Sequence, residues 1–216
     1  MKGVNYPGGG ATAKLTNNEQ RNYLIENIFT YEVPIKKQQH KLTLTAVQSV
    51  DHSQTKGLGY ATSDLPVDMD WDFISNGQFS GTPTRTFSEN NLVSFMGRAS
   101  YIFMDRYIMN VAIRRDGSSR FGKNNKYGYF PSISAGWAMT EEKFMKPLKQ
   151  VLSELKLRGS FGLSGNNAIG DYNYETKMSQ QSYIVDGSVV SGWAPSNIAN
   201  PDLKWEVSKQ TNLGVD

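Results

Sequence analysis

"RRDGSSRFGKNNKYGYFP" (residues 114–131) is a charged, glycine-containing link. The segments on its two sides are the strongest indication of the fold. "YIMNVAI" (107–113) precedes it and "SISAGW" (132–137) follows it, and both alternate apolar with polar residues. Alternation with a period of two is typical of a β-strand whose two faces meet different surroundings. The stretch therefore predicts a polar loop between two neighbouring strands.

The same alternation recurs along most of the chain and predicts an all-β protein. The candidate strands are residues 21–33, 40–51, 91–104, 107–115, 127–138, 155–166 and 204–216. Within 91–104, for example, Phe95 and Tyr101 lie on the face opposite Arg98. The 20 glycines, 11 tyrosines, 10 phenylalanines and 4 tryptophans among 216 residues also suit twisted sheets better than helices.

One segment, residues 140–155, has a helical apolar pattern. Thr140 is placed to cap it, and the adjacent Glu141 and Glu142 are interpreted as charges of its first turn. Pro147 interrupts the pattern and limits the helix to short pieces. The sequence thus predicts a single short helix between two strands.

The links between the strands alternate between short and long. Asp105 and Arg106 leave room only for a tight turn, whereas residues 52–90 and 165–203 are long and polar. Short turns at one end and long loops at the other are typical of an outer-membrane β-barrel. Soluble β-sandwiches space their turns more evenly.

The strand faces do not by themselves separate these two architectures. In a barrel the apolar face meets lipid and the polar face lines the lumen, whereas in a soluble sandwich the apolar face forms the core. Aromatic placement favours the barrel, since two belts would flank the membrane. Tyr101, Phe103, Tyr107 and Trp137 lie near short-turn ends, and Tyr127 and Tyr129 lie near a long-loop end. A secreted β-sandwich that binds carbohydrate is the alternative.

Composition excludes several other classes of protein. The 23 basic and 20 acidic residues are spread along the chain, which gives no footprint for nucleic acid. The absence of cysteine excludes disulfides and thiolate metal sites. Mean hydropathy is −0.51, and no apolar run reaches the ~18 residues of a spanning helix. The start lacks an apolar leader, so we expect either a processed protein or a fragment.

Four stretches then resemble one family, the SusC/RagA-type TonB-dependent outer-membrane receptors of the Bacteroidetes. They are "RRDGSSRFG" (114–122), "YGYFPSISAGWAMTEEKFM" (127–145), "LSELKLRGSFGLSGN" (152–166) and "NPDLKWEVSKQTNLGVD" (200–216), in the family's order and at compatible spacing. The residues that carry the resemblance, with an expected structural role, are Arg114, Asp116, Gly117, Arg120, Phe130, Pro131, Trp137, Asn166, Trp205 and Glu206.

The resemblance implies a plugged barrel of about 22 antiparallel transmembrane strands in the cell outer membrane. Residues 1–216 would form one partial barrel domain, about a third of the barrel, without the plug domain, signal peptide or final strands. It also implies uptake of a glycan, peptide or similar nutrient, with this segment as passive wall and loop-binding surface. The implied partners are a SusD-like surface lipoprotein, outer-membrane lipid and, through the missing N-terminal part, the TonB energy-coupling complex.

Catalytic and metal chemistry find little support in the sequence. Asp68, Asp70 and Asp72 have the spacing of a calcium loop, but Phe73 and Phe79 occupy the positions that need glycine and glutamate. His40 and His52 lie at opposite ends of a strand, ~40 Å apart, and cannot share a metal. Phosphate-binding loops, nucleophile elbows and zinc signatures are missing. We therefore expect no enzyme, no cofactor and no metal.

Two groups of residues are candidate binding sites. Arg98, Lys156 and Arg158 lie on the polar faces, and because a charge at mid-membrane on the lipid face costs ~2–4 kcal/mol, we expect them to face the lumen. There they would contact the plug or the substrate path, or only pair with other lumen residues. The second group consists of loop aromatics that would stack on a ligand or pack on the loops themselves: Trp71, Phe73, Tyr183 and Trp193.

The opening link itself is interpreted as architecture. Arg114, Asp116 and Arg120 are close enough in sequence to pair and brace the base of an outside loop, and Gly117 suits a turn. Tyr127 and Tyr129 would mark the point where the chain returns to the membrane.

Overall fold

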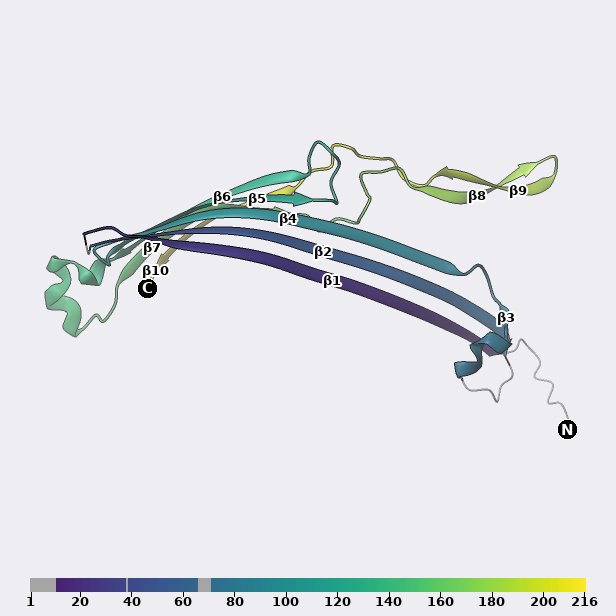
Figure 1. Ribbon diagram of the computed structural model, residues 1–216, viewed down its shortest axis with the longest axis horizontal. Helices are drawn as coiled ribbons and strands as arrows, with labels where there is room; N and C mark the ends of the chain where they lie inside the picture. Colours follow the sequence, from purple (N-terminus) through teal and green to yellow (C-terminus); the bar gives the residue numbers. More distant parts are fainter. Residues whose placement is uncertain (1–10, 38, 66–70) are drawn as a thin grey trace. The chain divides into compact units, whose positions relative to one another are not determined.

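The protein is an antiparallel β-sheet. At one end of its strands the connections are short turns, apart from the longer link between β6 and β7, and at the other end they are longer loops. The computed structural model describes residues 11–37, 39–65 and 71–216, apart from the side chains of 71–73 and 149–150. Seven long strands form the main sheet in the order β1-β2-β4-β5-β6-β7-β10 (Figure 1). These are β1 (Ala11–Val33), β2 (His40–Leu65), β4 (Thr84–Phe103), β5 (Tyr107–Ser118), β6 (Tyr127–Ala138), β7 (Lys156–Asn166) and β10 (Glu206–Val215). The predicted all-β fold with seven principal strands is confirmed.

The chain divides into two compact units, to which β1, β2 and β4 each contribute residues. The described part of the first unit is residues 11–23, 52–65 and 71–89. It contains η1 (Trp71–Asn76) and β3 (Gln78–Phe79), which pairs with β2. The second unit comprises Leu24–Asp51 and Asn90–Asp216 and holds β5, β6, β7 and β10 complete.

Three strands are longer than the sequence predicts. β1 begins at Ala11 rather than residue 21, β2 continues to Leu65, and β4 begins at Thr84. The added stretch of β1, "ATAKLTNNEQ" (11–20), has two alanines and one leucine as its only apolar residues, and its second half (16–20) is polar on both faces. Hydrogen bonds between the backbones of neighbouring strands maintain such extensions. Backbone pairing does not depend on the type of side chain, so it leaves no hydrophobic periodicity in the sequence. Much of the region 52–90, expected to be irregular, is therefore strand.

The predicted helix over 140–155 is replaced by two 3-10 segments, η2 (Met139–Glu141) and η3 (Lys143–Gln150). Thr140 does not cap a helix as expected, because it is buried within η2. The N-cap position of η2 is Ala138, which makes no side-chain cap hydrogen bond. Pro147 lies inside η3, where it lacks the N–H that a continuous α-helix needs. In place of a continuous α-helix, η2 and η3 connect β6 to β7 as short pieces.

Two hairpin turns have the backbone that the twist of β-strands favours. Met104 and Asp105, between β4 and β5, have φ of 55° and 53°. Asp186 and Gly187 have φ of 51° and 75° and join β8 (Met178–Val185) to β9 (Ser188–Pro195). Positive φ at both central residues is the type I′ pattern. The β8–β9 hairpin forms a sheet of its own inside the region 165–203, which the sequence analysis left as a loop.

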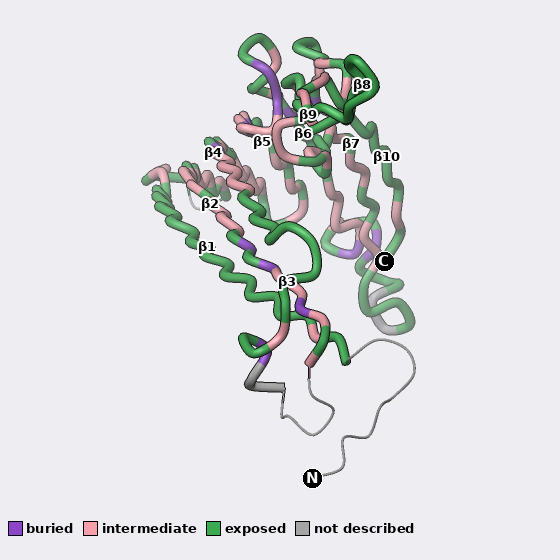
Figure 2. The backbone as a smooth tube through the Cα atoms, turned by 90° about the vertical axis from the view of Figure 1, so that its right-hand side faces the viewer, coloured by how far each residue is buried: buried purple, intermediate pink, exposed green. Residues whose placement is uncertain are grey.

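Few of the described residues are buried, and those few do not form a core beneath the sheet. Figure 2 shows exposed residues along the length of β1 and buried ones only in short patches. The principal buried cluster joins Phe121, Phe130 and Trp205, which are 0%, 6% and 8% exposed. It lies where β6 and β10 meet the link between β5 and β6, so hydrophobic burial stabilises the loops rather than a sheet-on-sheet interface.

Candidate functional site

One face of the sheet in the second unit carries a continuous row of small polar residues. The row runs across five strands through directly paired positions: Ser100, Asn110, Ser134, Ser160 and Asn212. Asn110 Nδ2 donates to Ser134 Oγ (3.2 Å), and Asn212 Nδ2 lies 3.5 Å from Ser160 Oγ. Hydrogen-bonded side chains of this size leave the face polar and open, and we name it the polar face.

The three predicted cations lie on or beside the polar face. Arg98 Nη2 donates to Asn110 Oδ1 (3.1 Å), and Arg158 Nη2 lies 3.0 Å from Asp216 Oδ1. Lys156 and Arg158 both line a cavity of about 560 Å³ in front of β6, β7 and β10. A Cβ atom at Gly214 would come within 2.6 Å of Arg158 Nε. The absence of a side chain at this glycine therefore makes room for the Arg158 guanidinium.

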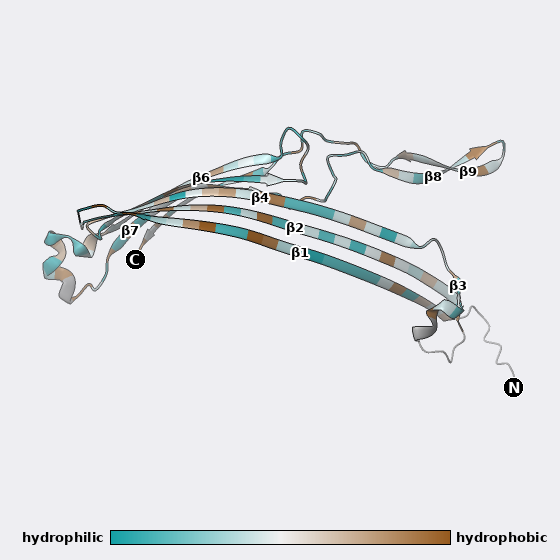
Figure 3. Cartoon of the chain, viewed as in Figure 1, coloured by the Kyte–Doolittle hydropathy of each residue, from teal (hydrophilic) through white to brown (hydrophobic). Residues whose placement is uncertain are grey.

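The opposite face is apolar and exposed. Val111, Ile133 and Phe161 occupy directly paired positions on three strands and are 44%, 44% and 46% exposed. Figure 3 shows hydrophobic bands on β1, β2 and β4 that alternate with polar ones. Within the described chain, no second sheet packs on this apolar face. Side chains of this type left uncovered across several strands indicate contact with lipid or with another protein.

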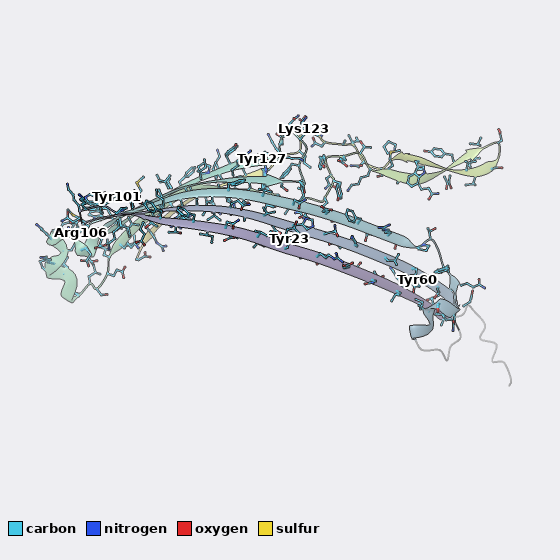
Figure 4. The ribbon with its side chains drawn as sticks, in the orientation of Figure 1. Tyr23, Tyr60, Tyr101, Arg106, Lys123 and Tyr127 are labelled. Atoms are coloured by element: carbon cyan, nitrogen blue, oxygen red, sulfur yellow. The ribbon has the colours of Figure 1, made fainter. Side chains whose placement is uncertain are left out.

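An aromatic row closes the apolar face at the short-turn end of the strands. The ring centroids of Phe103 and Tyr107 are 6.0 Å apart, and those of Tyr107 and Trp137 are 6.4 Å apart. His40 adds a fourth ring, 4.7 Å from Phe103. Figure 4 places Tyr101 and Arg106 at this end of the strands and Tyr127 toward the other.

Glu142 fixes this aromatic row from the connection between β6 and β7. Its carboxylate accepts hydrogen bonds from Tyr107 Oη (2.7 Å), Trp137 Nε1 (3.2 Å) and Arg106 Nη1 (3.1 Å). The bond from the Tyr107 hydroxyl and then the bond from the Trp137 indole hold the pKa of Glu142 below the usual glutamate range. The sequence predicts that Glu142 lies in the first turn of a helix, because no pattern in the sequence places it next to two aromatic residues of the strands.

Replacing Glu142 with Gln should make the protein less stable at neutral pH, with a difference that disappears in acid. A carboxylate whose folded pKa is depressed contributes stability above the pKa of about 4.3 of an unfolded glutamate. That contribution is lost as the pH falls through the lower folded pKa. Thermal unfolding midpoints measured from pH 7 to pH 3 should converge for the two proteins. Glu154→Gln, at an exposed position of the same connection, should leave the pH profile unchanged.

The charged residues of the opening link brace the long-loop end. Arg114 Nε donates to both carboxylate oxygens of Asp116 (2.7 and 2.9 Å), and its Nη2 donates to Ser94 Oγ (3.1 Å). Arg120 instead pairs with Asp171, 51 positions further on, at 2.8 Å. The sequence analysis did not single out Asp171, since a loop-to-loop pair leaves no periodic signal.

The other family residues surround the same loop base. Trp205 Nε1 donates to the carbonyl of Lys126 (3.1 Å), and its ring packs edge-on against Phe130 with centroids 5.4 Å apart. Asn166 Nδ2 donates to Glu206 Oε2 (3.0 Å). Gly117 approaches the ring of Tyr127 so closely that a side chain at this position would collide with it. Pro131 lies in β6 opposite Ile113.

The loop aromatics do not gather at one place. Trp71 and Phe73 begin η1, and their side chains lie outside the described residues, as do Asp68 and Asp70. Tyr183 on β8 and Trp193 on β9 belong to one hairpin, where Trp193 pairs with Gln180 and Tyr183 pairs with Val190. Alternation of side chains along a strand puts these two rings on opposite faces of the hairpin.

The spacing of the two aromatic rows matches a membrane. Tyr127 lies ten residues from Trp137 on β6, which is about 34 Å along the strand. With a tilt of ~40° this corresponds to about 26 Å of thickness, close to the apolar band of about 25 Å in transmembrane barrels. An apolar face bounded by aromatic rows, with a polar face behind it, defines a wall segment of a membrane-spanning β-barrel.

Comparison with known proteins identifies the family. Residues 3–216 match "TonB dependent receptor-like, beta-barrel", and the chain belongs to this family of outer-membrane barrels. It is 36% identical over 210 residues to TonB-dependent receptor P3 of Formosa agariphila, covering 97% of this chain and 20% of that protein. It is 38% identical over 136 residues to TonB-dependent receptor SusC of Bacteroides thetaiotaomicron, covering 60% and 13%.

Solved structures agree with this membership. The RagAB peptide transporter superposes with a TM-score of 0.83 at 26% identity, over 94% of this chain and 22% of that one. The chain thus spans about one-fifth of the length of the relatives that it matches. The predicted resemblance, the barrel fold and the outer-membrane location are confirmed. None of the described helices is long or apolar enough to cross a membrane.

Proposed function

We propose that residues 1–216 form part of the wall of a larger, TonB-dependent import receptor, with no catalytic role of their own. The observation that carries this proposal is the contrast between the two faces of the sheet in the second unit. The apolar face, bounded by two aromatic rows, would meet lipid, and the polar face would line the lumen. The wall stays passive while an inner-membrane energy source displaces a plug carried elsewhere in the receptor.

Arg98, Lys156 and Arg158 are then lumen-facing residues. Arg98 and Arg158 already have partners in Asn110 and Asp216, which suits a structural role. Lys156 lines the cavity beside Arg158 without a side-chain partner among the described residues. We infer that Lys156 is the cation of this group that contacts the plug or an anionic part of a passing substrate.

The imported ligand is proposed to be a glycan, a peptide or a similar nutrient, delivered by a SusD-like surface lipoprotein. Support comes from the relative named SusC and from the structural neighbour titled as a peptide transporter. The β8–β9 hairpin would contribute to the outside binding surface. Trp193 is 68% exposed there, whereas the ring of Tyr183 covers Gly192, so Trp193 is the better candidate for stacking on a ligand.

A fluorescence-quenching experiment tests the orientation of the sheet. Residues 1–216 contain no cysteine. In a complete receptor whose cysteines elsewhere, where present, are replaced by serine, a single cysteine at Val111 or at the adjacent Ala112 can carry a small fluorophore. Val111 lies on the apolar face and Ala112 on the polar face. In vesicles with brominated acyl chains, the dye at position 111 should be quenched strongly and the dye at 112 should not, because only lipid-facing dyes meet the bromine atoms.

The same experiment separates the barrel from the secreted carbohydrate-binding sandwich. In a soluble sandwich, position 111 would be buried in a protein core and brominated lipid would quench neither dye. Equal quenching at both positions, or none at either, would refute the proposed orientation. Detergent-free solubility of the unlabelled protein as a monomer would support the sandwich.

A further inference from the structure

Arg115 is a charged residue on the apolar face, where charge is expensive. The outward positions of β4, β5 and β6 follow from the alternation that puts Val111 and Ile133 on this face. They are Asn91, Val93, Phe95, Gly97, Ala99, Tyr101, Phe103, Tyr107, Met109, Val111, Ile113, Arg115, Gly117, Tyr127, Tyr129, Pro131, Ile133, Ala135 and Trp137. These positions leave out the part of β4 before residue 91, where the alternation also puts Arg85 and Glu89 outward, and among them Arg115 is the one with a charge. Its neighbour Arg114 points to the other face and pairs with Asp116.

The guanidinium of Arg115 has aromatic neighbours but no anion. Its Cζ lies 3.9 Å from the ring centroid of Tyr127 and 5.8 Å from that of Tyr129. Its Nε is buried and has no hydrogen-bond partner. Among the described residues, no carboxylate lies within ion-pair distance of it. The positive charge of Arg115 is therefore held against two aromatic rings without an anion among the described residues, although a guanidinium has further N–H donors to offer.

The surroundings of Arg115 combine apolar walls with polar groups. A groove of about 550 Å³ runs beside it, with Phe29, Phe95, Ile113 and Tyr129 among its lining residues. Asn27 and Gln48, which hydrogen-bond to each other at 2.7 Å, also line it. Such a groove has the chemistry for an acyl chain, with polar groups for a headgroup, rather than for a free small anion.

The level of Arg115 in the membrane selects the kind of partner. Arg115 pairs with Tyr129 across β5 and β6, and thus lies in the aromatic row at the long-loop, outward end. A lipid-facing arginine costs ~2–4 kcal/mol at the midplane but only ~0–1 near the interface. At the interface the available anions are headgroup phosphates, which a guanidinium binds with two parallel hydrogen bonds.

We propose that Arg115, held by Tyr127 and Tyr129, binds the phosphate of an outer-leaflet membrane lipid whose acyl chain lies in the adjacent groove. The proposal rests on the orientation of the sheet under the proposed function. The quenching experiment at position 111 tests that orientation independently, so a failure of one is distinguishable from a failure of the other. The lipid would fix the depth of the barrel wall on the side of β4–β6.

Native mass spectrometry of the complete receptor, released from detergent with added phosphatidylglycerol, tests the site. Arg115→Gln should lower the apparent affinity for the first bound lipid about tenfold, which corresponds to about 1.4 kcal/mol, because the neutral amide loses the charge-assisted hydrogen bonds to the phosphate. Arg115→Lys should retain part of the binding, because lysine keeps the charge but lacks the fork. Lys123→Gln, an exposed cation of the same link, should bind as the unmodified receptor does.

Two outcomes would overturn the proposal. The first is phosphatidylglycerol binding by Arg115→Gln equal to that of the unmodified receptor, with both proteins showing the same heat-modifiable migration of a folded barrel. The second is complete displacement of the lipid by inorganic phosphate at equal concentration, which would show that the acyl chain contributes nothing. Diacylglycerol, which lacks the phosphate, should bind the two proteins alike.

Discussion

Replacing Ile133 with Arg should destabilise the folded barrel by about 2–4 kcal/mol, whereas Ser132→Arg should cost far less. Ile133 lies four residues from both Trp137 and Tyr129, midway between the two aromatic rows. A guanidinium there would face the centre of the acyl chains. Ser132 is its immediate neighbour on the polar face, where water or the plug can solvate the same charge.

This pair of variants matches local backbone, strand and depth, and differs only in the face that receives the charge. Equilibrium unfolding of the complete receptor in lipid vesicles, followed by tryptophan fluorescence in urea, gives the two free energies of unfolding. Equal losses for Ile133→Arg and Ser132→Arg would contradict the assignment of the faces. The same loss in a detergent-free soluble form would point to a protein core instead of lipid.

Replacing Trp205 with Ala should cost about 3–5 kcal/mol, the usual range for truncating a buried aromatic residue. The Trp205 side chain is 8% exposed and packs between Phe121 and Phe130, with ring centroids 5.0 and 5.4 Å away. Its removal would leave a cavity that the neighbouring glycines do not fill. Gly128 and Gly165 both adjoin the ring of Phe130, where any side chain would collide.

The loss should appear first in the loops. Limited proteolysis of the complete receptor should cut the link 119–126 and the segment 196–204 faster in Trp205→Ala. Trp205→Phe keeps a ring but loses the hydrogen bond to Lys126, and should cost about 0.5–1.5 kcal/mol. Trp193→Ala, at a 68% exposed position, should stay within ~0.5 kcal/mol of the unmodified protein. Equal stability of the Trp193 and Trp205 variants would show that the cluster does not hold the loops.

The alternation of apolar and polar residues predicted the strands whose two faces differ in polarity. It missed strand segments whose two faces are similar in polarity. The segment 11–20 has only two alanines and one leucine on its less polar face, and residues 16–20 are polar on both faces. Pairing with a neighbouring strand, rather than a hydrophobic face, makes it part of β1. The β8–β9 hairpin did leave a signal, because Asp186-Gly187 between "SYIV" and "SVVS" is the residue pair that a type I′ turn favours. The length and polarity of the surrounding region concealed it.

Side-chain partners were less predictable than strands. The Arg114–Asp116 pair is local, and the sequence suggested it, but Arg120 finds Asp171 only because two loops fold onto one base. The sequence predicted Glu142 to be a charge in the first turn of a helix, whereas in the structure it accepts hydrogen bonds from Tyr107 and Trp137. Arg115 carried a usable signal, since counting by two from Val111 puts it on the apolar face. The missing counter-charge appears only in three dimensions.

The base of the β8–β9 hairpin is closed by its own bonds. Ser196 N donates to the carbonyl of Lys177 (2.8 Å), and Asn197 Nδ2 donates to the carbonyl of Glu175 (3.0 Å). None of residues 178–195 is buried. Because these bonds close the hairpin on itself, we expect that residues 178–195 can be replaced by a hairpin of another length or sequence without a change in the strands of the main sheet.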